Sequence, residues 1–404
     1  MPAQVVLQES LRFGIASCLH RTNTGNLLEF ANRPWLVPIY FDDAPTIVIR
    51  KPSQIGITEY CLVSMWTDLC QRRPGLYVLP TNKWMQLFCA SRIKQTTQQV
   101  AFYRDAMNWS DADVDNVEMM TFFGVNVKFI GANKEFGFYE FPAAWVIVDE
   151  YDLCDPANLV LLEDRLGATE HPRVRKVGNP TTPGIGIDAE LDLSDYKQWF
   201  IQCPSCNQWQ TPGYFTHVVR EVDTGKYELR DKQAQTHVDQ AIKSDPFPAA
   251  MEIVKHHHKQ EGTDARLLCE KCEKPIDRLA PGWWVPKHPG RVTSGYAVNK
   301  TFADYRTTPV ILDMYQAHQE ASASPAKLQR FYQKLLGEPY EGEGSRFTGR
   351  LLQQCGRQYE APLSLPAKIE VAGKIYEITE AIAHLRSGPE GHQRTTQRHS
   401  EITR

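Results

Sequence analysis

The sequence predicts an α/β fold with a mostly parallel, doubly wound sheet, on three observations. Short apolar and β-branched runs alternate with segments whose apolar residues recur at helical spacing, the pattern of strands joined by helices. The run at 46–50 breaks into a glycine-containing loop, and the run at 145–148 ends in two acids, Asp149 and Glu150. Two Cys-x-x-Cys pairs further along the chain predict a zinc-ribbon insertion in this fold.

The composition is that of a globular protein. The chain has 404 residues, of which 42% are hydrophobic and 23% charged, enough for two or three domains with a full core. The formal net charge of −3 argues against a uniformly basic surface but allows a local basic track. No apolar segment approaches the roughly eighteen residues of a membrane span, so we expect neither secretion nor membrane insertion.

The loop at 51–58 resembles a phosphate-binding loop with a displaced lysine. In the common pattern GxxxxGK[ST], backbone N–H groups cradle phosphate oxygens, the lysine neutralises them and the hydroxyl ligates Mg²⁺. Gly56 and Thr58 match this pattern, whereas Ile57 stands in the lysine position and Lys51 replaces the first glycine. A lysine entering the loop can fold its ammonium back onto the phosphates. The plain alternative is an ordinary strand–turn–helix.

The strand that ends in Asp149 and Glu150 supplies the partners that such a loop needs. Its four apolar residues predict a central strand buried on both faces, and ligands bind at the carboxyl ends of strands in open α/β sheets. In a P-loop ATPase the first acid holds the Mg²⁺ shell, and the second orients or deprotonates the attacking water. Loop and strand together predict a P-loop NTPase core of the RecA/ASCE type that binds ATP and Mg²⁺.

The other elements follow in chain order. Residues 1–45 form a leader, in which Tyr40 could lie against an adenine ring, with a packed core aromatic as an equal alternative. Helical spacing predicts a helix over 58–72 whose N-terminal dipole faces the nucleotide, and Thr81 suits a helix N-cap. Further strands are predicted at 76–79, 126–130, 145–148 and 173–177.

Four of the ten cysteines form two knuckles, Cys203–Cys206 and Cys269–Cys272. Each knuckle places two thiolates on one tight turn, and a Zn²⁺ ion can close the long insertion between them. Without a secretory signal, cysteines indicate thiols or metal in preference to disulfides. We predict one structural Zn²⁺, with a chance pairing of buried cysteines as the alternative.

A basic stretch follows the second predicted strand. Residues 71–104 contain six basic residues and no acid, with aromatic residues interleaved. This pattern predicts contact with nucleic-acid phosphates, and a solvated helix face is the alternative. The basic residues are Arg72, Arg73, Lys83, Arg92, Lys94 and Arg104.

Composition and motif positions divide the chain into five parts. These are a leader at 1–45, an ATPase core at 46–200, a zinc-ribbon insertion at 201–280, a helical or linker subdomain at 281–345, and a short, partly disordered tail at 346–404.

The motifs and their order resemble those of a known family. They are the displaced-lysine loop, the segments 78–81, 148–152, 163–165 and 178–182, the first cysteine knuckle and the sequence LGEPY at 336–340. Together they resemble the lambda-type large terminase subunit, the DNA-packaging ATPase of tailed bacteriophages, over roughly residues 30–345. The shifted lysine and LGEPY are the more specific parts of this resemblance.

The resemblance implies roles for individual residues. Glu150 would be the catalytic carboxylate, and Thr181 and Thr182 the motif that couples the γ-phosphate to DNA movement. Arg165 is a candidate transition-state arginine, with a surface ion pair as the alternative, and Arg50 could compete with Lys51 for the phosphate. The implied nucleotide and Mg²⁺ site consists of Arg50, Lys51, Ser53, Gln54, Gly56, Ile57, Thr58 and Asp149, with Thr58 and Asp149 as the Mg²⁺ ligands.

The resemblance also implies a motor that couples ATP hydrolysis to translocation of double-stranded DNA into a procapsid in the host cytoplasm. Its partners would be DNA, a small terminase subunit, a portal protein and other copies of itself. Terminases of this type carry a nuclease domain after the ATPase, and the 64 residues after Tyr340 are too few for its carboxylate cluster. We therefore expect cleavage by a separate nuclease, or a truncated or diverged chain.

Two other functions remain open at this point. A superfamily-2-like helicase would need a second RecA-like domain, for which residues 281–404 do not look long or regular enough. A zinc-dependent DNA-binding or assembly protein with an inactive ATP fold is favoured by Ile57 in the lysine position.

Overall fold

The computed structural model describes residues 10–31, 33–107, 116–139, 141–221, 264–303, 309–321, 324–342, 368–371 and 374–377. Residues Met1–Ser345 and Arg346–Arg404 form separate compact units. In the second unit, β13 (Lys368–Val371) pairs antiparallel with β14 (Lys374–Glu377). The rest of the predicted tail lies outside the described residues.

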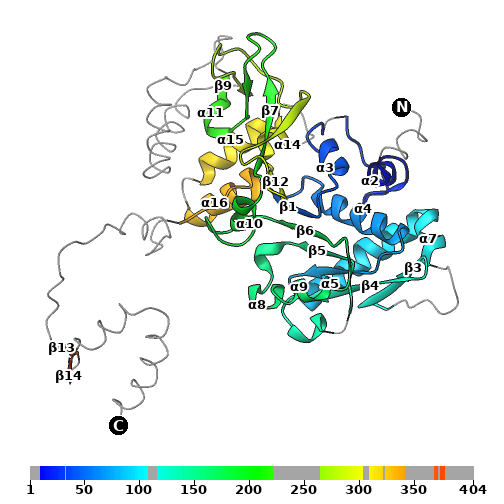
Figure 1. Ribbon diagram of the computed structural model, residues 1–404. Helices are drawn as coiled ribbons and strands as arrows, with labels where there is room; N and C mark the ends of the chain where they lie inside the picture. The colour runs from blue at the N-terminus through cyan, green and yellow to red at the C-terminus, as the bar shows by residue number, and fades with distance from the viewer. Residues whose placement is uncertain are drawn as a thin grey trace. The chain divides into compact units, whose positions relative to one another are not determined.

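One ten-stranded sheet organises the first unit (Figure 1). Its strands are β1 Thr46–Arg50, β2 Gly75–Leu79, β3 Met119–Phe122, β4 Val125–Gly131, β5 Trp145–Asp149, β6 Arg173–Gly178, β7 Lys197–Gln202, β8 Trp209–Gln210, β11 Gly282–Pro286 and β12 Ser294–Ala297. Their order is β11-β7-β12-β1-β6-β5-β2-β4-β3, with β8 paired to β7. The neighbours from β7 to β4 are parallel, and β11, β8 and β3 add antiparallel pairs. The predicted mostly parallel sheet is confirmed.

Helices cover the sheet and connect its strands. They are α2 Leu11–Gly14, α3 Val37–Phe41, α4 Ile57–Cys70, α5 Asn82–Phe88, α6 Lys94–Gln99, α7 Ala101–Met107, α8 Pro156–Leu159, α9 Leu162–Arg165, α10 Ile187–Leu193, α11 Tyr214–His217, α14 Lys300–Ala303, α15 Pro309–Ala321 and α16 Pro325–Arg330. Shorter 3-10 or π-helical turns are η1 Ile15–Leu19, η2 Cys89–Ile93, η3 Glu135–Phe138, η4 Tyr151–Leu153 and η5 Phe331–Leu336. None of the described helices is long and apolar enough to cross a membrane.

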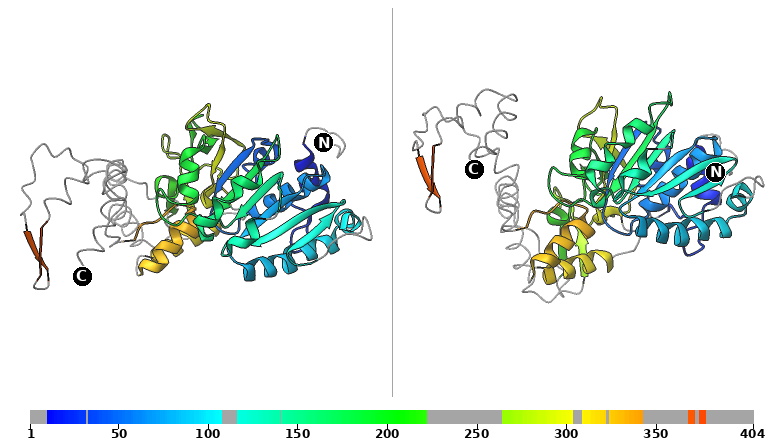
Figure 2. Two further views of the ribbon diagram at one scale, coloured as in Figure 1. Left: turned by 60° about the horizontal axis from the view of Figure 1, so that its bottom comes forward. Right: turned by 90° about the horizontal axis from the view of Figure 1, so that it is seen from below.

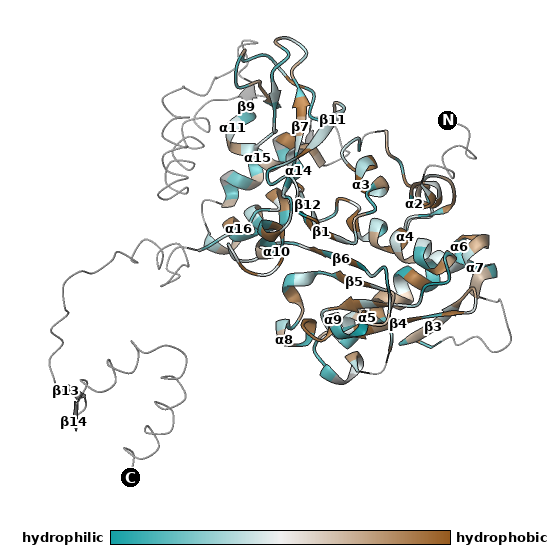
Figure 3. Cartoon of the chain, in the orientation of Figure 1, coloured by the Kyte–Doolittle hydropathy of each residue, from teal (hydrophilic) through white to brown (hydrophobic). Residues whose placement is uncertain are grey.

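Alternating residues of the central strands enter different cores, because successive side chains of a strand point to opposite faces. In β2, Tyr77 and Leu79 join the larger core together with residues of α4, whereas Leu76 and Val78 join a second core. The strand is buried along its whole length, as is β5, and Figure 3 shows β5 largely in brown. Burial on both faces explains why these strands read as continuous apolar runs.

Two local predictions agree closely with the structure. Helix α4 occupies Ile57–Cys70, close to the predicted 58–72, and begins directly at the loop after β1. The Thr81 hydroxyl accepts a hydrogen bond from the Trp84 N–H at 3.2 Å and so caps α5.

Residues 281–345 differ from the predicted helical or linker subdomain, because they supply β11 and β12 to the sheet. Strand β12 lies directly beside β1, with Ile47 opposite Ser294. Its sequence Ser-Gly-Tyr-Ala lacks the β-branched residues that signal a strand. Gly295 is needed there because a Cβ would lie 1.7 Å from the Ser194 hydroxyl oxygen.

After β12 the chain continues into α14, α15, α16 and η5. Figure 2 shows α15 and α16 (yellow to orange) near the part of the sheet that holds β7 and β12, away from β3 and β4. The Ser53 N–H in the loop after β1 donates to the Lys334 carbonyl of η5 at 2.9 Å. This late segment therefore contacts the predicted phosphate loop directly.

Candidate active site

The loop between β1 and α4 has the backbone that its glycine predicts. Gly56 is the residue before α4 and has φ 92° and ψ 9°, a left-handed conformation that favours glycine. A Cβ at this position would also lie 3.1 Å from an Arg33 guanidinium nitrogen. The first N–H groups of a helix have no partner within the helix, so the start of α4 is suited to an anion.

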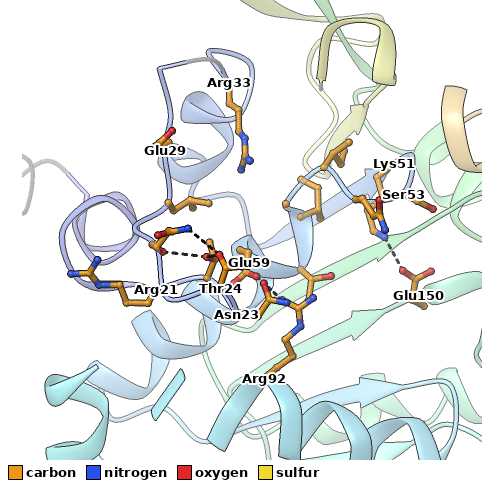
Figure 4. A pocket seen from close by; sticks show the side chains of 18 of the residues that line it. Arg21, Asn23, Thr24, Glu29, Arg33, Lys51, Ser53, Glu59, Arg92 and Glu150 are labelled. Carbon is orange, nitrogen blue, oxygen red and sulfur yellow. Dashed lines mark hydrogen bonds and ion pairs between the residues drawn. The ribbon is translucent and has the colours of Figure 1, made fainter. Parts of the chain in front are cut away.

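Lys51 and Glu150 meet at the carboxyl ends of β1 and β5. The Lys51 ammonium lies 2.8 Å from Glu150 Oε1, and the two side chains are 6% and 19% exposed. Figure 4 shows this pair at one end of a cavity. Burial opposes the charge on Lys51, but the Glu150 and Asp149 carboxylates together outweigh it, so the pKa of Lys51 is raised.

The hydroxyl of Thr58 and the carboxylate of Asp149 form an oxygen pair beside this lysine. Thr58 Oγ1 and the Tyr77 hydroxyl each donate to Asp149 Oδ2 at 3.2 Å. Burial raises the pKa of Asp149, while the Lys51 ammonium opposes that shift. Adjacent ligands of an octahedral Mg²⁺ lie about 2.9 Å apart, so Thr58 and Asp149 fit the predicted metal ligands.

A cavity of about 930 Å³ is lined by Lys51, Thr58 and Glu150, but not by Asp149. It extends from the loop residues to the leader segment that contains Arg21, Asn23, Thr24 and Glu29, as Figure 4 shows. Its other lining residues are Thr22, Asn26, Leu27, Leu28, Arg33, Ser53, Gln54, Ile55, Gly56, Ile57, Glu59, Trp84, Arg92, Leu153, Asn179 and Lys334. Of the predicted binding residues, Lys51, Ser53, Gln54, Gly56, Ile57 and Thr58 line it.

The segment after β6 contacts both the loop and η5. The Asn179 amide nitrogen donates to the Lys51 carbonyl at 2.8 Å, and its oxygen accepts from the Lys334 ammonium at 2.9 Å. Lys334 gave no signal in the sequence, because nothing local relates it to a loop nearly three hundred residues earlier. Asn179 lay within a recognised motif but was not singled out.

Thr181 is held by its neighbours. Its N–H and its hydroxyl both donate to Asp152 Oδ2 at 2.8 Å, and its carbonyl accepts from the Gln333 side chain at 2.7 Å. Thr182 is half-buried, and its carbonyl accepts from the Ile185 N–H at 3.3 Å. Neither threonine lines the cavity, so their role in coupling stays a prediction.

Arg50 and Tyr40 lie away from the cavity, which corrects two expectations. Arg50 points to the opposite face of β1 from its neighbours, as strand alternation requires, and its guanidinium lies 2.5 Å from Asp188 Oδ1. Tyr40 is fully buried and packs edge-to-face against Phe30 and Tyr60. A tyrosine in this position contributes to the core and cannot reach an adenine ring in the cavity.

Arg165 also lies outside the cavity lining. Its guanidinium donates to the Tyr139 carbonyl, and its own carbonyl accepts from the Ala143 N–H at 3.0 Å. These bonds tie Arg165 to the turn before β5, so the described structure does not support a transition-state role for it within its own chain.

The two cysteine knuckles meet, as predicted. The sulfur atoms of Cys203, Cys206, Cys269 and Cys272 all lie within 4.8 Å of one another, and Cys203–Cys272 and Cys206–Cys269 are each 3.6 Å apart. Four thiolates around Zn²⁺ at about 2.3 Å are about 3.8 Å from one another, so the cluster fits this ion. The first knuckle lies in the β7–β8 hairpin, and the second follows β10 (Asp264–Leu267), which pairs with β9 (Val218–Glu221).

Part of the predicted basic stretch serves the fold. Arg73 pairs with Asp68 at 3.3 Å, and Arg92 pairs with Glu59 at 2.8 Å. Lys83 lines a neighbouring cavity of about 450 Å³ that also contains Asp149 and Glu150. Residues 71–104 therefore do not form a continuous track of basic side chains that are all available to DNA.

The sheet, the loop before α4 and the two acids at the end of β5 together define the chain as a P-loop NTPase. A sequence model of one family, described as the phage terminase large subunit gpA ATPase domain, matches residues 41–283. Because the match covers more than half of the chain, the chain belongs to this family. A comparison with curated proteins gives no match.

Several solved structures are similar to the chain. The HK97 bacteriophage large terminase has 10% identity and a TM-score of 0.45, with 84% of this chain and 55% of that chain covered. The Thermus phage P74-26 large terminase ATPase domain has 11% identity and a TM-score of 0.33, with 55% and 91% covered. The large terminase of another thermophilic bacteriophage, in complex with ADP, has 13% identity and a TM-score of 0.30, with 43% and 42% covered. The chain thus spans about half the length of the HK97 protein.

Proposed function

We propose that this terminase ATPase domain hydrolyses ATP at the Lys51 loop and uses the reaction to move double-stranded DNA into a phage procapsid. The observation that carries the proposal is the meeting of Lys51, Thr58, Asp149 and Glu150 at the carboxyl ends of β1 and β5, the two strands on either side of β6. These groups are the cation, the metal ligands and the carboxylate that phosphoryl transfer to water requires.

Each residue has a distinct task in this scheme. The Lys51 ammonium and the N–H groups at the start of α4 bind phosphate oxygens, and Thr58 and Asp149 would hold Mg²⁺, which neutralises charge on the phosphates when bound. The Glu150 carboxylate orients a water molecule and accepts its proton. Lys51 now holds Glu150 at 2.8 Å, so a phosphate that attracts Lys51 also frees the carboxylate for this water.

The leader provides the other end of the nucleotide site. The cavity reaches Arg21, Thr22, Asn23 and Thr24, where the base and ribose would lie once the phosphates occupy the loop. This segment takes the place of Tyr40, whose ring is buried in the core.

The segment after β6 offers a route from the phosphates to the rest of the motor. Asp152, two residues after Glu150, accepts from the Thr181 N–H and hydroxyl at 2.8 Å and from the Ile187 N–H at 2.6 Å. A shift of Glu150 on nucleotide binding would therefore move the Thr181 segment, which supports the coupling role of Thr181 and Thr182.

The main argument for an inactive ATP fold was the absence of a lysine at position 57. Ile57 occupies the usual lysine position, but its side chain is 1% exposed and belongs to the core. Lys51 provides an ammonium at the loop instead. A portal protein, a small terminase subunit, a separate nuclease and further copies of the chain remain proposed partners in the host cytoplasm.

DNA-stimulated ATP hydrolysis by the purified chain tests the proposal. Glu150→Gln keeps the shape of the side chain but cannot accept a proton, so we expect ATP binding with hydrolysis at least about 100-fold slower. Glu170→Gln, a change at an exposed acid outside the cavity, serves as the matched control and should behave like the unaltered chain. Equal hydrolysis by both variants would refute the role of Glu150.

A further inference from the structure

A second lysine, Lys334, reaches the phosphate end of the cavity from η5. It comes from a part of the chain outside the residues that match the family model, 41–283. Its side-chain hydrogen bond among the described residues is to the neutral amide oxygen of Asn179, at 2.9 Å.

The cationic side chains that line this cavity are unequally paired. Lys51 is neutralised by Glu150, and Arg92 by Glu59, each at 2.8 Å. Lys334 has no carboxylate within ion-pair distance in the part of the chain that the structure describes. Burial lowers the pKa of Lys334, the charge of Glu150 raises it, and the nearby Lys51 ammonium lowers it. A partly buried cation beside another cation is stabilised by an anion between them.

The backbone fixes Lys334 relative to the phosphate loop. Its carbonyl accepts the Ser53 N–H at 2.9 Å, so this loop amide is already occupied. Asn179 links the same two parts, because its amide nitrogen donates to the Lys51 carbonyl while its oxygen accepts from Lys334. A side chain that is anchored in this way loses little further freedom when it binds a ligand.

The position of Lys334 in the cavity favours contact with the terminal phosphate of a bound nucleotide. Lys334 bonds to Asn179, which also donates to the Lys51 carbonyl. Lys51 and Glu150 lie at the end of the cavity away from the leader residues (Figure 4). Glu150 is the carboxylate that acts on the water attacking the γ-phosphate in the proposed function. A cation at this end meets the γ-phosphate of ATP and finds no such group on ADP.

We propose that Lys334 binds the γ-phosphate and makes the site prefer ATP over ADP. The inference rests on the proposed function, since it assumes that nucleotide phosphates occupy the Lys51 loop. On binding, the Lys334 ammonium exchanges its hydrogen bond with Asn179 for one with the phosphate. One contact between η5 and the segment from Asn179 to Thr182 is then lost only when a γ-phosphate is present, while the Gln333 side chain of η5 still donates to the Thr181 carbonyl.

Equilibrium calorimetry on the full chain tests this assignment, with ADP and a non-hydrolysable ATP analogue as ligands. Lys334→Ala removes the cation, and Lys334→Gln removes the charge but keeps a donor for Asn179. Lys327→Ala is the matched control, because Lys327 lies on α16, is 61% exposed and pairs with Glu320 at 3.7 Å. Losing a charged hydrogen bond should weaken binding of the analogue about tenfold or more.

We expect both Lys334 variants to lose affinity for the analogue. Their affinity for ADP should change by no more than about twofold, which is no larger than the effect of losing one neutral hydrogen bond. Lys327→Ala should change neither affinity. An equal loss for ADP and the analogue, or no loss in Lys334→Gln, overturns the inference while leaving the proposed function intact. If the unaltered chain binds neither nucleotide, or if Lys51→Ala binds both unchanged, the proposed function itself fails.

Discussion

Lys51 and Glu150 hold each other through a 2.8 Å contact between the ammonium and the carboxylate. Burial lowers the pKa of Lys51, but the Glu150 and Asp149 carboxylates together raise it above its ordinary value. A lysine whose pKa is raised on folding stabilises the folded state fully at pH values below its ordinary pKa of about 10.4. This stabilisation is lost as the pH rises through the folded-state pKa. Lys51 is therefore charged at neutral pH, and a nucleotide phosphate must compete with Glu150 for it.

The first prediction concerns the choice between Lys51 and Arg50 as the phosphate-binding cation. Lys51→Ala removes the ammonium from the cavity and should lower the rate of ATP hydrolysis by about 100-fold or more, as for loss of one preorganised donor. The fold should persist. Steady-state hydrolysis and a thermal melt on the same preparation measure both quantities.

Arg50→Ala is the informative comparison, because Arg50 pairs with the buried Asp188 at 2.5 Å on the other face of β1. Leaving that carboxylate unpaired should cost about 3–5 kcal/mol of unfolding free energy. Loss of hydrolysis in a folded Arg50→Ala protein, with Lys51→Ala still active, would transfer the phosphate role to Arg50.

A second prediction concerns the dependence of hydrolysis on pH. Burial raises the pKa of Asp149, and the hydrogen bond from Tyr77 lowers it by favouring the carboxylate. Tyr77→Phe removes that donor, so the pKa of Asp149 rises further and the proton stays on at higher pH. The acidic limb of the pH–rate profile should move to higher pH by less than about one unit, the equivalent of one hydrogen bond.

Tyr103→Phe controls for the loss of a buried tyrosine hydroxyl, since Tyr103 bonds to His20 at 3.3 Å and does not contact Asp149. Its acidic limb should match that of the unaltered chain. A limb that stays in place in Tyr77→Phe would mean that ionisation of Asp149 does not limit the reaction.

The sequence predicted the centre of the sheet well because the relevant signals are local. The buried runs of β2 and β5, the helix after the loop and the N-cap at Thr81 each depend on residues within about ten positions of one another. The proximity of Lys51, Thr58, Asp149 and Glu150 was also predicted, because parallel strands bring their carboxyl ends to one edge.

The sequence did not predict contacts made between distant segments. Strand β12 was missed because its sequence has low strand propensity. Gly295 is required there by the close approach of Ser194, not by any preference for a strand. Lys334 was missed because its link to the loop passes through Asn179 and a backbone bond to Ser53. Arg50 was predicted to compete for the phosphate because it precedes Lys51 in the sequence. Successive side chains of a strand point to opposite faces, so Arg50 instead pairs with Asp188 on the other face of β1.

A third prediction is that the four clustered cysteines bind one Zn²⁺. Metal analysis of the purified chain should give about one zinc per chain, as for a single four-ligand site. Replacing Cys206 and Cys272 by serine removes one thiolate from each knuckle and should abolish binding. Cys18→Ser, at an exposed cysteine outside the cluster, should keep the zinc. Zinc retained in the double variant would show that the cluster is not the site.

The last prediction concerns Gly337, which has φ +70° at the end of η5. A Cβ there would lie 2.7 Å from Pro52 N and Cδ and from the Val298 carbonyl oxygen. Gly337→Ala therefore has to push η5 away from the phosphate loop or move the loop itself. Gly184 has an almost equal φ of +71°, but a Cβ there would meet nothing within 4 Å.

Comparing Gly337→Ala with Gly184→Ala separates the cost of backbone strain from the cost of steric crowding. Both alanine variants carry a left-handed residue, which costs about 1–2 kcal/mol, and only Gly337→Ala adds the clash, worth about 1–3 kcal/mol more. Chemical denaturation should show the larger loss of unfolding free energy in Gly337→Ala. Because η5 carries Lys334, nucleotide affinity should fall in this variant as well. Equal destabilisation of the two variants would mean that η5 and the loop are not tightly packed in solution.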